Sequence, residues 1–68
     1  MELSEIRELA KERLDWKPTC VFLIREINSV KFYGVNGSNN KLRAVVVYNK
    51  DLGEIEIIEW QVWKSILF

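Results

Sequence analysis

The sequence predicts a small α+β domain in which one N-terminal helix packs on a four-stranded antiparallel meander, in the order α-β-β-β-β. Three observations support this fold class. Apolar residues recur at helical spacing in the first 16 residues, short apolar runs rich in β-branched residues follow, and turn sequences separate those runs at hairpin distances. Because 68 residues are enough for one domain only, we expect a single small α+β domain over residues 1–68.

The helix is expected over residues 3–16. Its apolar positions follow the period of one helix face: Leu3, Ile6, Leu9, Ala10 and Leu14. Ser4 is the expected N-cap, because its hydroxyl can accept a bond from an unpaired N–H group of the first turn. Pro18 ends the helix, since the residue before a proline is pushed out of the α region. We expect Trp16 to fold back onto the core.

Four runs rich in strand-forming residues follow the helix. The expected strands are residues 20–27, 30–35, 41–48 and 54–57. The expected turns between them are Asn28-Ser29, the loop 36–40 with Asn36-Gly37, and the loop 49–53 with Gly53. The first run is continuously apolar from Cys20 to Ile24, which is typical of a strand with neighbours on both sides, so we expect it to be a central strand.

The C-terminal segment fits two secondary structures. At Ile57-Ile58 the alternation of apolar and polar residues slips by one, which predicts a bulge or a change of element. Residues 59–68 form either a strand, with Trp60, Val62, Ile66 and Phe68 on one face, or a short helix. Their β-branched and aromatic content favours the strand.

The strand over residues 41–48 is apolar on both sides of its pleat, and a strand of this kind is buried on both faces. One sheet face is expected to pack on the helix with Phe22, Ile24, Val30, Phe32, Leu42, Ala44, Val46, Tyr48, Ile55 and Ile57. The other face is expected to carry Val21, Leu23, Tyr33, Val35, Val45 and Val47, with Arg25, Lys31 and Arg43 among them. One helix covers one face, so the C-terminal segment, a second copy or another partner must cover the other.

The composition argues against catalysis and metal binding. The chain has no histidine, so the commonest general base is missing. Cys20 is the only cysteine and has no base to activate it, which excludes an intrachain disulfide and a zinc site of histidines and cysteines. We therefore expect no enzyme, no catalytic residue, no cofactor and no metal. A chain this short seldom stabilises its core alone, and oligomerisation is the remaining means.

The ends of the chain carry no targeting pattern. Its N-terminus is acidic, unlike a signal peptide, and no apolar stretch approaches the roughly 20 residues that span a bilayer. A lone cysteine fits a reducing compartment. We expect a cytoplasmic protein with no transmembrane segment.

The formal net charge is zero, but basic residues gather in the middle of the chain. Arg25, Lys31, Tyr33 and Arg43 share one expected sheet face, and basic residues around an aromatic side chain are one way to hold single-stranded nucleic acid. With a net charge of zero the electrostatic contribution to such binding is weak. A small nucleic-acid-binding regulatory protein that uses the basic central strands is therefore the alternative prediction.

The stretch Val45-Val46-Val47-Tyr48-Asn49-Lys50-Asp51-Leu52-Gly53-Glu54-Ile55 resembles the PepSY domain family. That family has a helix followed by an antiparallel meander that ends in V-x-V-[DN]-x-x-T-G-E-I, and here Leu52 stands in place of the threonine. The similarity covers about residues 3–57. It implies a binding module without catalytic residues; PepSY domains mostly lie outside the cytoplasm and are linked to the restraint of peptidases.

The function predicted from these observations is that of a small non-enzymatic protein-interaction module with a regulatory role. We expect it to form a homodimer or a larger assembly through an apolar sheet face or the Trp-rich tail, and to bind another protein. Tryptophan is enriched among the residues that carry most of the binding energy in protein interfaces. The expected interface residues are Val35, Val45, Val47, Trp60, Trp63 and Phe68.

Overall fold

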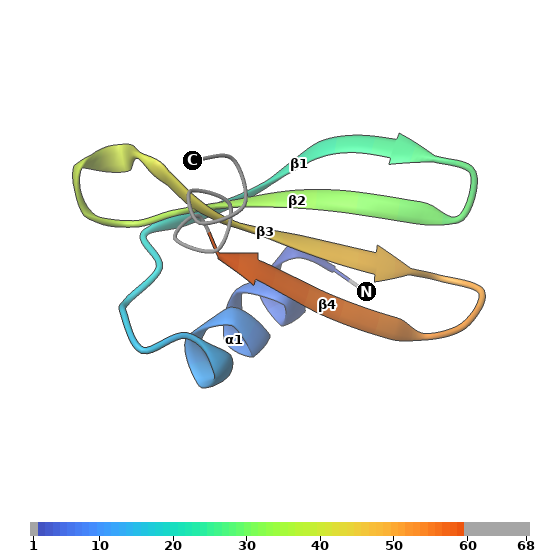
Figure 1. The fold of residues 1–68 in the computed structure, drawn as a ribbon, viewed down its shortest axis with the longest axis horizontal. Coiled ribbons are helices and arrows are strands. Elements are labelled where there is room, and N and C mark those ends of the chain that lie inside the picture. The colour runs from blue at the N-terminus through green and yellow to red at the C-terminus, as the bar shows by residue number, and fades with distance from the viewer. Residues whose placement is uncertain (1, 60–68) are drawn as a thin grey trace, which may run out of the picture.

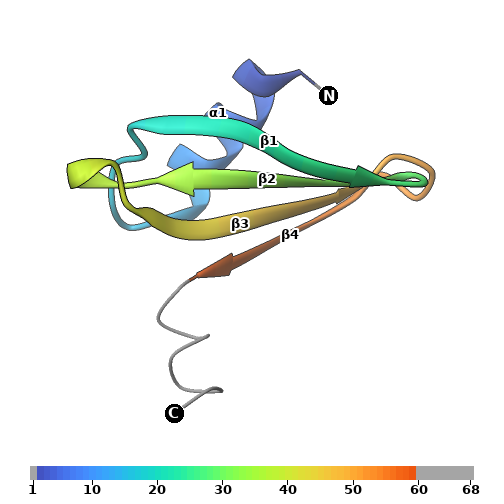
Figure 2. The same cartoon turned by 90° about the horizontal axis from the view of Figure 1, so that it is seen from above.

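The computed structural model describes residues 2–59 of the chain. The described elements are α1 (Leu3–Arg13), β1 (Cys20–Ile27), β2 (Val30–Asn36), the 3-10 helix η1 (Ser38–Asn40), β3 (Leu42–Asn49) and β4 (Glu54–Glu59). The four strands are antiparallel neighbours in the order β1-β2-β3-β4, and α1 lies on one face of their sheet (Figures 1 and 2). The predicted α-β-β-β-β fold class is confirmed. Of residues 59–68, for which a strand or a short helix was predicted, Glu59 ends β4 and residues 60–68 lie outside the described residues.

Helix α1 is shorter than predicted and begins on a different cap. Glu2 is the N-cap, and its backbone N–H donates to Glu5 Oε1 at 3.2 Å, which satisfies a group that the helix leaves unpaired. Ser4 lies inside the first turn, so its prediction as N-cap is wrong. The helix ends at Arg13. The prediction that Trp16 folds back onto the core is confirmed, because Trp16 is partly buried and packs against the core residues.

The core lies between α1 and the helix-side face of the sheet. Ile6, Ala10 and Leu14 supply the helix side of this core. The sheet side is made by Tyr33, Val35, Ala44 and Val46, with Val21, Tyr48, Ile55 and Ile57 packed around them. Buried apolar area of this kind is the main source of stability in a domain without a disulfide.

The sheet faces were predicted correctly for β4 and for Ala44, Val46 and Tyr48 of β3. They were predicted wrongly for most of β1 and β2 and for Leu42, which lies on the face of Gly34 after the register shift in β3. Ala44 and Val46 do face the helix, but Tyr33 opposes Val46 and Val35 opposes Ala44, so Tyr33 and Val35 face it as well. Val30 and Phe32 alternate with them and lie on the opposite face, which we call the open face. A shift of one residue in register exchanges the two faces of a strand, and the alternation of β2 is apolar on both sides, so it does not choose between them.

The irregular positions of the sheet also differ from those predicted. The pairing of β3 with β4 runs without interruption from Ala44–Glu59 to Asn49–Glu54, so the bulge or change of element predicted at Ile57-Ile58 is wrong. The register shifts instead within β1, between Leu23 and Arg25, and again after Val35. The extra residue in β1 is Ile24, which has no partner in β2.

Two hairpin turns meet at one end of the sheet (Figure 1). Asn28 and Gly53 take the positive φ angles of +55° and +67° that such turns require, as predicted for the Gly53 loop. Side chains join the turns: the Ser29 hydroxyl bonds the Asp51 carboxylate, and Lys50 Nζ donates to Glu26 Oε2 at 2.7 Å. The two hairpins are therefore held in register at their tips.

Gly34 in β2 makes room for an aromatic ring from β1. Phe22 pairs directly with Gly34 across the strands, and a Cβ atom added to Gly34 would lie 2.6 Å from Phe22 Cζ. The ring of Phe22 therefore covers the glycine, which would otherwise leave a gap on the open face.

Replacing Gly34 with alanine is expected to destabilise the fold by about 1–3 kcal/mol, because the new methyl group displaces the Phe22 ring. Urea unfolding of Gly34→Ala measures this cost. The control is the same change in a Phe22→Leu background, where a more flexible side chain should lower the cost. Equal costs in both backgrounds would rule out the Phe22 contact as the cause.

Candidate protein interface

Strand β1 forms one edge of the sheet. It pairs with β2 on one side, and no strand within residues 2–59 pairs with its other side. The prediction that it is a central strand is therefore wrong. An edge strand presents a row of unpaired N–H and C=O groups, which makes it a template for another strand.

The exposed large apolar side chains gather at this edge. Among residues 2–59 six such side chains are exposed, and four of them lie in β1: Phe22, Leu23, Ile24 and Ile27. A fifth, Leu3 at the start of α1, lines a groove together with Val21 of β1. We call these five residues, Leu3 with Phe22, Leu23, Ile24 and Ile27, the β1 margin. Such a concentration of apolar surface is typical of an interaction site.

Helix α1 lies beside the start of β1, near Cys20 and Val21, and leaves the rest of this edge uncovered. Leu23 and Tyr33 oppose each other on the helix-side face, yet Leu23 is 47% exposed and Tyr33 only 3%. Phe22 and Ile27 share the open face with Gly34 and Val30. The edge is thus apolar on both faces of the sheet, and a strand added there would meet apolar side chains above and below.

The opposite edge of the sheet is protected by charge. Strand β4 carries Glu54, Glu56 and Glu59, and charged side chains on an edge strand disfavour pairing with another strand. In β1 the only charged residues are Arg25 and Glu26, whose charges cancel. The two edges therefore differ, and the β1 edge is the one open to a partner.

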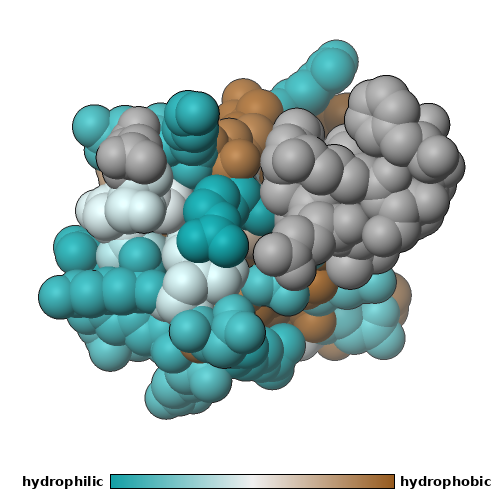
Figure 3. All heavy atoms as spheres, turned by 60° about the vertical axis from the view of Figure 1, so that its left-hand side comes forward, coloured by the Kyte–Doolittle hydropathy of each residue, from teal (hydrophilic) through white to brown (hydrophobic). Residues whose placement is uncertain are grey.

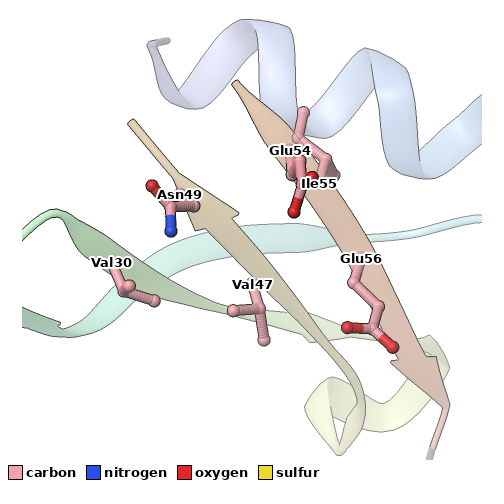
Figure 4. Close-up of a pocket in the computed structure, with 6 residues that line it drawn as sticks. All are labelled: Val30, Val47, Asn49, Glu54, Ile55 and Glu56. Atoms are coloured by element: carbon pink, nitrogen blue, oxygen red, sulfur yellow. The ribbon is translucent and has the colours of Figure 1, made fainter. Parts of the chain in front are cut away.

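A shallow groove crosses the open face, with a volume of about 440 Å³. Figure 4 shows Val30, Val47 and Glu56 arranged across β2, β3 and β4, with Asn49, Glu54 and Ile55 around them. Its floor is apolar, its rim carries the carboxylates of Glu54 and Glu56, and its six residues include no hydroxyl, thiol or basic side chain. Nor do histidine, cysteine, aspartate or glutamate side chains of residues 2–59 gather in a group that could hold a metal ion.

The structure places the predicted interface residues in different environments. Val35 is fully buried beneath α1, so it is not available as an interface residue, and its prediction as one is wrong. Val45 and Val47 do lie on the open face, Val45 buried and Val47 half-buried. Trp60, Trp63 and Phe68 lie outside the described residues.

The residues of the nucleic-acid alternative do not form one surface. Tyr33 is buried in the core and Lys31 lies on the same face, opposite Glu26. Arg25 opposes Phe32 on the open face, and the Arg43 guanidinium stacks 4.4 Å from the centre of the Trp16 ring. A base cannot stack on Tyr33 in this arrangement.

The stack of Arg43 on Trp16 belongs to a contact that ties three parts of the fold together. Trp16 Nε1 donates to Glu59 Oε1 at 3.0 Å, while its ring carries Arg43. The segment after α1 is thereby linked to the start of β3 and to the end of β4. Arg43 and Glu59 are engaged in structure here, not offered to a ligand.

Sequence reasoning missed most of the β1 margin, because it assigned Phe22 and Ile24 to the helix-covered face and treated the whole strand as central. A signal was available in the element order. The first strand of a meander has no preceding strand, so it lies at an edge unless a later strand returns to it. Its apolar side chains are then exposed unless a partner covers them.

Elsewhere on the surface of residues 2–59, Leu52 is the one other large apolar side chain that is exposed. Figure 3 shows that the described side chains at the end of the molecule that carries η1 are mostly hydrophilic. No helix in the described part of the chain has the length and apolar character needed to cross a membrane. Comparisons with protein-family models, with curated proteins and with solved structures give no match for this chain. The resemblance to PepSY domains stays a prediction.

Replacing Trp16 with phenylalanine is expected to lower the free energy of unfolding by about 1 kcal/mol, because Glu59 loses its donor while an aromatic ring remains under Arg43. Urea unfolding at one fixed protein concentration measures the loss. Glu59→Gln keeps an acceptor oxygen and should cost less. Full stability of Trp16→Phe would show that the hydrogen bond contributes nothing.

The ion pair between the two hairpin tips predicts that the stability of the fold depends on pH. The hydrogen bond from Lys50 holds the pKa of Glu26 below its ordinary value, and the nearby charge of Lys31 adds to this more weakly. A lowered carboxyl pKa stabilises the fold above the pKa of the unfolded chain, and this stabilisation is lost as the pH falls through the lower folded pKa. Carboxyl NMR titration should show the pKa of Glu26 rising in Lys50→Gln and rising less in Lys31→Gln. A larger rise in Lys31→Gln would contradict the assignment to Lys50.

Proposed function

We propose that this chain is a non-enzymatic protein-interaction module that self-associates by burying the β1 margin. The observation that carries the proposal is the position of the exposed apolar side chains. Five of the six in residues 2–59 lie at one edge strand or beside it, with Leu23 on the helix-side face of the sheet and Phe22 and Ile27 on the open face. A regulatory role fits a module that recognises protein without catalysis, as the resemblance to PepSY domains also implies.

The size of the apolar surface supports association. The members of the β1 margin are 37–49% exposed. Full burial of such a side chain is worth about 1.5–3 kcal/mol, so covering the exposed half of ten of them in a dimer contributes on the order of 10 kcal/mol. Association itself costs about 4–15 kcal/mol in lost freedom. The two quantities are similar, which favours a reversible homodimer.

Chemistry and location fit the same proposal. Within residues 2–59 the exposed thiol of Cys20 has no basic side chain bonded to it, and nucleophilic catalysis needs one. A free exposed thiol persists in a reducing compartment, which supports the cytoplasm as the location.

Replacing Ile24 with lysine is expected to disperse the assembly, because the substitution places a charge in the centre of the buried surface. Light scattering of the wild-type chain at high micromolar concentration should give about twice the mass of 8.1 kDa, and Ile24→Lys should give the single-chain mass. The matched control is Leu52→Lys in the β3–β4 turn, where an exposed leucine lies away from the β1 margin and should be dispensable.

Two outcomes would overturn the proposal. A wild-type chain that stays at 8.1 kDa over the whole concentration range shows that the margin does not drive self-association. An assembly that survives Ile24→Lys but is dispersed by Val47→Asp places the contact on the open face around Val47 instead.

A further inference from the structure

We infer that the second copy docks by strand addition: β1 of each chain pairs antiparallel with β1 of the other, and the two sheets join into one sheet of eight strands around a two-fold axis. The inference rests on the proposed function, and it names the backbone geometry of the contact. In this arrangement each chain pairs with the free β1 edge of the other. No β1 edge is left for a third chain, so the assembly closes as a dimer.

The first support is the match between β1 and a copy of itself. Directly opposed residues of two paired strands project to the same face of the sheet, so a partner strand must offer apolar side chains on both faces here. Strand β1 does so, with Leu23 on the helix-side face and Phe22 and Ile27 on the open face. A second β1 therefore offers apolar neighbours to the exposed side chains of the first β1 on both faces of the sheet.

The second support is charge. A head-to-tail contact between β1 and the β4 edge of another copy would place Glu54 and Glu56 beside Phe22 and Ile27, and it would bury carboxylates against apolar side chains. It would also leave an edge free at each end, so chains would add without limit. Pairing β1 with β1 avoids both costs, because it keeps the β4 glutamates out of the contact and uses both β1 edges; the charges of Arg25 and Glu26 within β1 cancel.

The third support is the position of the bulge. Ile24 is the residue of β1 without a partner in β2, it is 49% exposed, and it lies at the middle of the strand, with four residues before it and three after it. Two antiparallel copies overlap most fully when the two-fold axis passes beside Leu23 or Ile24. The side chain that β2 does not engage then lies next to its equivalent in the second copy.

This geometry predicts which cysteines form a disulfide between chains. At about 3.4 Å per residue, the two Cys20 residues of such a dimer lie roughly 20–27 Å apart along the strands, beyond the reach of a disulfide bond. Leu23 and Ile24 lie next to the axis instead. The native cysteine therefore serves as a control for a cysteine introduced four positions later, because only the introduced thiol lies close enough to its equivalent in the second chain to form a disulfide.

The experiment oxidises three variants in a Cys20→Ser background: Leu23→Cys, Ile24→Cys and Leu52→Cys. Removal of two electrons and two protons by a mild oxidant joins two thiols in one disulfide. We expect a cross-linked dimer from Leu23→Cys or Ile24→Cys, little from Leu52→Cys, and little from wild-type Cys20. The second measurement is hydrogen exchange of the unsubstituted chain, in which amides of residues 20–27 should become more protected as the concentration rises.

The outcomes separate this inference from the proposed function. A dimer by light scattering without cross-links at Leu23→Cys and Ile24→Cys, and without added protection in residues 20–27, overturns strand pairing and leaves self-association standing. Efficient cross-linking through wild-type Cys20 overturns the antiparallel register. Assemblies that grow beyond a dimer with concentration overturn the closed two-fold arrangement. A chain that is monomeric throughout overturns both.

Discussion

The constraint behind the rest of the structure is that one helix of 11 residues covers only part of a four-stranded sheet. Ile6, Ala10 and Leu14 seal the centre, over Tyr33, Val35, Ala44 and Val46. What the helix does not reach must be polar, be covered by another part of the assembly, or stay exposed. The β1 margin is apolar and exposed, so the surface that remains after folding is itself the strongest indication of what the molecule does.

The two edge strands of the sheet, β4 and β1, differ in the side chains that they expose. Glutamates alternate with isoleucines along β4, so Ile55 and Ile57 pack on the core while Glu54 and Glu56 face away from it. Strand β1 has no such alternation, and its apolar run continues across both faces. A chain under pressure to stay monomeric would carry charge at both edges. Here β4 has a net negative charge and the two charges of β1 cancel, so the β4 edge disfavours a partner strand more than the β1 edge does.

The sequence was sufficient to predict the element order, because helical spacing, apolar runs and hairpin turns are local signals. It was insufficient to predict which residues of β2 face the helix. Tyr33 and Val35 alternate with Val30 and Phe32, and both pairs are apolar, so only the pairing with β3 decides between them. The same ambiguity led to Val35 as an interface residue and to Tyr33 as a stacking platform. The edge position of β1 was deducible from topology, whereas the bulge at Ile24 depends on tertiary packing.

The proposed association would use residues of β1 that also stabilise the fold, so it would be coupled to folding. Phe22 covers Gly34 within the chain and yet remains 37% exposed, so a second copy would bury further a ring that already closes a gap in the first. Any partner that binds the folded edge and not the unfolded chain stabilises the fold by mass action. A domain of 68 residues has a small core and no disulfide, so its stability is modest when it is alone. The exposed edge adds no stability to the isolated chain, and it would become a source of stability in the proposed dimer.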